Sequence, residues 1–173
     1  VILLVRSDIF SVLNDTDLNK IKQTNTLSIN WGDRVNIDSP LIHLVVQKAK
    51  RSNRYLNQYS DSEVFAMLFP QDVRGVNPEK FILERTLFRP RDVITFLNLI
   101  IEKYPKSSYF GWKGLLELKP KYSEYLYDEV RNEMLGHVSQ AEMDQGLKLL
   151  KNFNKHFFEF NELKGYYTRQ IKH

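Results

Sequence analysis

The sequence of 173 residues is 42% hydrophobic and 27% charged, with only 7 Gly and 6 Pro, which is typical of a globular protein and excludes collagen-like and low-complexity classes. The absence of Cys excludes disulfides, thiolate nucleophiles and thiolate zinc sites. The net charge of +4 comes from residues 146–173, which carry 6 basic and 2 acidic side chains, a small excess for a dedicated nucleic-acid surface.

Two segments near the start of the chain have the pattern of β-strands. Residues 1–5 (VILLV) are uniformly apolar, as in a strand buried on both faces of a parallel sheet, and residues 26–31 alternate between polar and apolar side chains. A strand that is buried on both faces, as predicted for residues 1–5, needs further parallel strands beside it, and the rest of the sequence does not supply them. We therefore expect residues 1–36 to be the end of an α/β domain that begins upstream. The apolar run is far shorter than the about 20 residues that cross a bilayer, so we expect a cytoplasmic protein that does not bind membranes.

The remaining sequence predicts helices. Proline at the first helical position marks the starts at Pro40, Pro78 and Pro90, and Ser-x-x-Glu capping boxes begin at Ser60 and Ser139. We expect helices over residues 40–54, 61–69, 78–88, 90–104, 123–135 and 140–153. The predicted fold class is therefore mainly α, a multi-helix bundle with one or two leftover strands.

The most distinctive motif surrounds Pro90, which lies between Arg89 and Arg91 at the start of an apolar helix. The unpaired N–H groups and the dipole of a first helical turn favour an anion, and each arginine adds permanently charged donors for a phosphate. The alternative is that Asp92 pairs with one of these arginines and no ligand binds.

Residues 85–98 (RTLFRPRDVITFLN) resemble the RPRD helix of a group of prokaryotic P-loop ATPases related to AAA+ and STAND proteins. In that group the helix belongs to a helical lid after the ATPase core, and an arginine at its start, the sensor-2 group, touches the terminal phosphate of the nucleotide. Further pieces resemble the same group in the same order: residues 1–10, which resemble the sensor-1 strand with its LRSDI tip, residues 17–21 and 29–31, and, more loosely, residues 122–129.

The resemblance implies three regions: the remnant of the ATPase core over residues 1–36, the helical lid over 37–106, and a C-terminal helical module of winged-helix type over 107–173. It also implies that Arg6, Arg89 and Arg91 sense the nucleotide phosphate, and that the partners are the remainder of the ATPase domain and further copies of the protein. The sequence has no G-x-x-x-x-G-K-[ST] loop, so we expect ATP and Mg²⁺ to bind only with an upstream P-loop, and no hydrolysis by this chain alone.

The two arginines of the motif are expected to differ in role. Residues two apart on a helix differ by about 200° in direction, so both cannot point at one phosphate. Arg89 precedes the proline in extended backbone, and we expect it to contact the phosphate. We expect Arg91, inside the helix, to be restrained by the protein.

Two other function classes fit the sequence. A nucleic-acid-binding module would use Lys48, Lys50 and Arg51, the basic tail, and Lys119 and Lys121, which follow a segment rich in aromatic residues. A helical protein-interaction domain would need no ligand. The acidic residues Glu129 and Glu133 are expected to lie on a solvated helix face.

Overall fold

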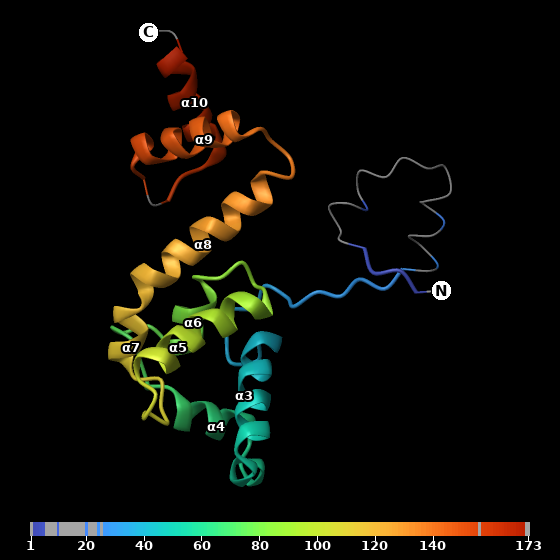
Figure 1. Ribbon diagram of the computed structural model, residues 1–173, viewed down its shortest axis with the longest axis vertical. Coiled ribbons are helices and arrows are strands. Elements are labelled where there is room, and N and C mark those ends of the chain that lie inside the picture. Colours follow the sequence, from blue (N-terminus) through green and yellow to red (C-terminus); the bar gives the residue numbers. More distant parts are fainter. Residues whose placement is uncertain are drawn as a thin grey trace.

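The computed structural model describes residues 2–5, 10, 20, 24, 26–155 and 157–171. The protein is mainly helical, as the sequence predicts (Figure 1). Its helices are α3 (Pro40–Ser52), the 3₁₀ helix η1 (Arg54–Gln58), α4 (Asp61–Leu68), α5 (Pro78–Leu83), α6 (Pro90–Lys103), α7 (Trp112–Glu117), α8 (Lys119–Met134), α9 (Gln140–Phe153) and α10 (Phe160–Ile171).

The helix starts predicted from capping boxes and first-turn prolines are confirmed. Both capping boxes form, because the Ser60 and Ser139 side chains accept from backbone N–H groups three residues on, while Glu63 and Glu142 reach back to the serines. Proline occupies the first turns of α3, α5 and α6. These local signals were sufficient to predict where α3, α4, α5, α6 and α9 begin.

Several predicted helix limits are wrong. Helix α5 ends at Leu83 rather than at residue 88, because Phe88 has a φ of 53° and the chain turns sharply before Pro90. Helix α8 begins at Lys119 instead of Ser123, and α7 has no counterpart among the predicted helices.

One hydrophobic core joins α3 to α8. Helices α3 and α6 pack together, and α6 also contacts α7 and α8 (Figure 1). The core is formed by Leu41, Ile42, Val45, Val46, Val64, Phe65, Phe69, Val73, Phe81, Ile82, Leu83, Val93, Phe96, Leu97, Ile100, Leu115, Leu118 and Tyr122. It therefore crosses residue 106, where the sequence suggested a boundary between lid and C-terminal module. The boundaries at 36 and 106 stay predictions.

Helices α9 and α10 contact each other past the C-terminal end of α8, away from α3 and α4 (Figure 1). Phe153 of α9 packs against Phe158 and against Tyr166 of α10, at ring-centroid distances of 5.3 and 5.1 Å. Met143 is buried there without joining the core of α3 to α8. This pair of helices has its own small aromatic cluster.

The two expected strands are not formed in the described residues. Residues 2–5 and 26–31 have no regular secondary structure, and Leu27 and Ile29 are 86% and 75% exposed. A strand exists only when a second strand pairs with its backbone, and the described part of the chain supplies none.

The winged-helix expectation is also not supported. A wing is a β-hairpin, and beyond residue 106 the described backbone contains helices and turns only. The nearest feature of that kind in the described residues is an isolated bridge between Val73 and Val76, before α5. Among the described helices, none has the length and apolarity needed to cross a membrane.

Candidate functional site

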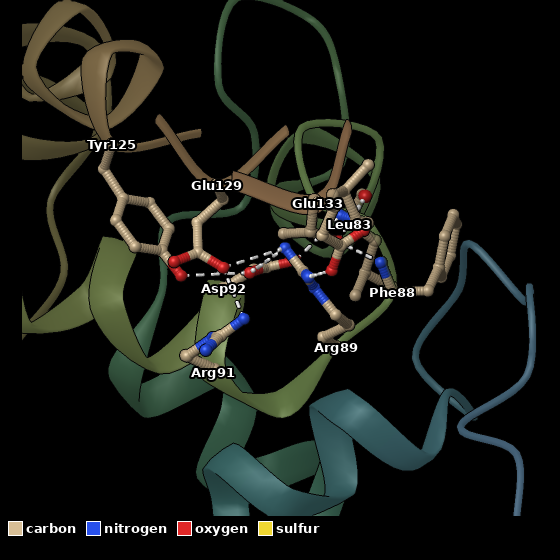
Figure 2. A network of polar contacts seen from close by, with 10 residues as sticks. Leu83, Phe88, Arg89, Arg91, Asp92, Tyr125, Glu129 and Glu133 are labelled. Carbon is tan, nitrogen blue, oxygen red and sulfur yellow. Dashed lines mark hydrogen bonds and ion pairs between the residues drawn. The ribbon is translucent and has the colours of Figure 1, made fainter. Parts of the chain in front are cut away.

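The candidate site lies where the start of α6 meets α8, and a buried carboxylate is at its centre. The Asp92 side chain is fully buried and accepts four hydrogen bonds. Two come from Arg89, from Nε at 3.0 Å and Nη2 at 3.1 Å. The backbone N–H of Leu87 donates the third at 3.0 Å, and the Tyr125 hydroxyl donates the fourth at 3.1 Å (Figure 2). The desolvation of this charge is therefore offset by a full set of donors.

The turn between α5 and α6 is held in a strained conformation that supports this arrangement. Phe88 has left-handed backbone, which is costly for a bulky residue. Its N–H donates to the Thr86 hydroxyl at 3.2 Å, and that hydroxyl donates to the Leu83 carbonyl at 2.8 Å. Together with the bond from Leu87 to Asp92, these contacts fix the backbone that leads into Arg89.

Arg89 is bound by three carboxylates. Besides its two bonds to Asp92, Nη1 pairs with Glu133, and Nη2 lies 3.5 Å from Glu129 (Figure 2). Its side chain is 23% exposed. Burial by itself would lower the pKa of Arg89, but the hydrogen bonds and charge of Asp92, with the charges of Glu133 and Glu129, raise the pKa above its ordinary value. Arg89 is thus a structural cation.

Arg91 is far less constrained. Its Nη2 pairs with Glu129, and its side chain is 60% exposed. The Glu129 carboxylate, which is 18% exposed, therefore interacts with both arginines. Because the arginine of this pair is largely exposed, the pair contributes little to stability and Arg91 can exchange partners.

Helix α8 supplies one face to the site. Tyr125, Glu129 and Glu133 are spaced four apart, so they lie on the same side of the helix and point toward α6 (Figure 2). Beneath them the Tyr122 ring is buried against Phe96, with ring centroids 4.6 Å apart. Burial raises the pKa of the Tyr122 hydroxyl, and nearby Asp92 raises it further. The polar network thus covers an aromatic core.

Residues 40–131 match the family model of the FunZ-associated C-terminal helical domain, FunZ_C, and make up more than half of the chain. The chain belongs to this family. The FunZ_C match runs from the first residue of α3 into α8, so it includes Asp92, both arginines and Glu129. No curated protein and no solved structure matches the chain. The match supports, in coarse form, the expectation of a C-terminal helical domain, and it covers residues 40–131.

The structure brings together two of the three predicted sensing residues. Arg89 and Arg91 share Glu129, whereas Arg6 lies outside the described residues. Arg89 is the more restrained and Arg91 the more exposed of the two side chains, the opposite of the expected geometry, and the expected phosphate contact of Arg89 stays a prediction. The pairing of Asp92 with an arginine of the motif is observed, and the arginine is Arg89.

The solvated face expected for two acids of α8 is wrong for Glu129, which is 18% exposed and contacts both Arg89 and Arg91. Glu133 is 47% exposed, as expected for a solvated face, but it also pairs with Arg89. Sequence reasoning treated them as ordinary surface acids. Two signals could have identified them. Both acids are spaced at four-residue intervals from Tyr125, which places them on one helix face, and the arginine-rich motif needs counter-charges.

The residues proposed for nucleic acid are divided between α3 and the start of α8. Lys50 is bound to Asp61 at 2.6 Å, while Lys48 and Arg51 are exposed. Lys121 lies 4.0 Å from Glu102, and Lys119 is exposed. Carboxylates therefore neutralise part of this basic set. Elsewhere in the described chain, no three His, Asp or Glu side chains gather as a metal site would require.

Proposed function

We propose that the FunZ_C region of this chain is the helical lid of a P-loop ATPase and that it transmits the nucleotide state to its C-terminal helices. The single observation that carries the proposal is the exposed Arg91, which is linked to α8 through Glu129 alone. This geometry favours Arg91 over Arg89 as the phosphate contact.

The proposed mechanism is an exchange of anions. A terminal phosphate that approaches Arg91 offers a bidentate partner of higher charge than Glu129 and competes with it. Glu129 then keeps its contact with Arg89, which Asp92 holds in place. Loss of the phosphate restores the pair of Arg91 with Glu129. The contact between α6 and α8 thereby depends on the nucleotide.

The ATPase core, which would supply the P-loop and the ligands of Mg²⁺, is part of the proposal. Residues 2–5 and 26–31, with exposed apolar side chains and no strand partner, would complete its sheet. Arg6 would extend from the first of these strands toward the nucleotide. In this arrangement the chain is a regulatory part of the enzyme, and the hydrolytic groups lie outside it.

ATP turnover of the longer polypeptide that carries the P-loop tests the proposal. Arg91→Ala should slow ATP turnover, because a charge-assisted contact to the phosphate is lost. The activation free energy should rise by about 2 to 3 kcal/mol. The stability of this variant should change by less than about 1 kcal/mol, because Arg91 is 60% exposed and Glu129 keeps its contact with Arg89. Arg51→Ala, an exposed arginine of α3, is the matched control. Parent-like turnover by Arg91→Ala would refute the sensing role.

A further inference from the structure

Arg85 differs from the other two arginines of the motif because no carboxylate pairs with it. Within the described residues it forms no ion pair, and its Nε is buried without a hydrogen-bond partner. Arg89 and Arg91 are both neutralised by acids. Partial burial of a guanidinium without a paired carboxylate costs free energy, which a counter-ion would offset.

The guanidinium is nevertheless well positioned. Its Cζ lies 3.7 Å from the centroid of the Phe81 ring, and Nη1 donates to the Phe81 carbonyl at 2.5 Å. The ring supports one face of the cation, and the carbonyl fixes one edge. The other donors of the fork have no partner in the described chain. Burial lowers the pKa of Arg85, with only the adjacent Glu84 opposing it, which agrees with a missing counter-charge.

We infer that Arg85 binds a phosphate group supplied by another molecule. Because Nε is buried, the terminal Nη1 and Nη2 groups of the stacked guanidinium are the donors suited to hydrogen-bond one oxyanion in parallel. The choice of phosphate over carboxylate rests on the proposed function. Arg85 is the first residue of the segment 85–98, but the sequence analysis did not name it as a phosphate contact.

The experiment follows the arginine Nε–H resonances of the ¹⁵N-labelled 173-residue chain by NMR during addition of inorganic pyrophosphate at constant ionic strength. The Arg85 resonance should shift and saturate, because the anion binds a guanidinium that has no carboxylate partner in the described chain. Arg51, exposed and without an ion pair in the described chain, reports general screening. Arg85→Lys keeps the charge at the end of α5 but removes the fork, so its apparent affinity should fall at least about tenfold.

Three further results separate the alternatives. A shift at Arg85 no larger than that at Arg51, or parent-like affinity in Arg85→Lys, would show that Arg85 only caps α5 and would overturn the inference. Equal shifts with sodium acetate would also overturn it, in favour of a carboxylate on a partner protein. Saturation by pyrophosphate but not by ADP would support a phosphate site that excludes nucleotides, while the nucleotide-sensing function is tested separately by the turnover of Arg91→Ala.

Discussion

Replacement of Asp92 by Asn is the most direct test of the network between α6 and α8. The substitution preserves the shape of the side chain but removes the charge and places an amide N–H₂ group near the guanidinium of Arg89. Two charge-assisted hydrogen bonds, of 3.0 and 3.1 Å, are lost or weakened. Hydrogen bonds to charged groups contribute about 1.5 to 3 kcal/mol each, and breaking a buried ion pair costs about 3 to 5 kcal/mol.

The expected cost is below the sum of these terms, because Arg89 retains Glu133 and Glu129 and is 23% exposed. We expect Asp92→Asn to lower the free energy of unfolding by about 3 kcal/mol, a large share of the roughly 5 to 15 kcal/mol of a typical domain. Urea unfolding followed by circular dichroism measures it. Glu133→Gln, whose carboxylate is 47% exposed, is the control and should cost less than about 1 kcal/mol.

A double-mutant cycle isolates the pair. Arg89→Met leaves Asp92 buried without its cation. The double variant, Arg89→Met with Asp92→Asn, should therefore be less destabilised than the sum of the two single variants. The difference, which is the coupling free energy, should be about 1.5 to 3 kcal/mol. If Asp92→Asn costs no more than Glu133→Gln, or the cycle shows no coupling, Asp92 does not anchor α6 in the way described.

Three further predictions concern other parts of the molecule. Gly114→Ala should destabilise the chain by about 1 to 3 kcal/mol in urea unfolding, because a Cβ there would lie 2.9 Å from Cγ2 of Ile100; a cost near zero would contradict the close contact of α6 and α7. The hydrogen bond from Lys50 lowers the pKa of Asp61 below its ordinary value of 3.8, so this pair stabilises the fold above that pH and the effect is lost as the pH falls through the lowered value. Asp61→Asn should therefore reduce the acid sensitivity of thermal unfolding, and an unchanged pH profile would count against the pair. Binding to double-stranded DNA, measured by fluorescence anisotropy, should be weak with a log–log salt slope of about −3 to −4, whereas a slope near −8 would favour the nucleic-acid function.

The sequence by itself determined the helical class and the starts of most helices. Caps and first-turn prolines act within one turn, so the signals at Ser60, Ser139 and Pro90 needed no knowledge of the rest of the fold. The same local logic raised the possibility that Asp92 pairs with an arginine of the motif. Both partners lie in the first turn of α6 or next to it, so their proximity follows from helix geometry.

Only the tertiary structure decided which arginine is held and which is exposed. Glu129 and Glu133 lie about forty residues from the arginines in sequence and reach them because α8 packs on α6, a contact that no local pattern encodes. The early end of α5 likewise depends on a turn stabilised by Asp92 from the next helix. The expected strands at residues 1–5 and 26–31 had strand-like sequences but no partner in the described chain. A strand is stabilised by hydrogen bonds to another segment, whereas a helix makes its own, which is why the helices were predictable and the strands were not.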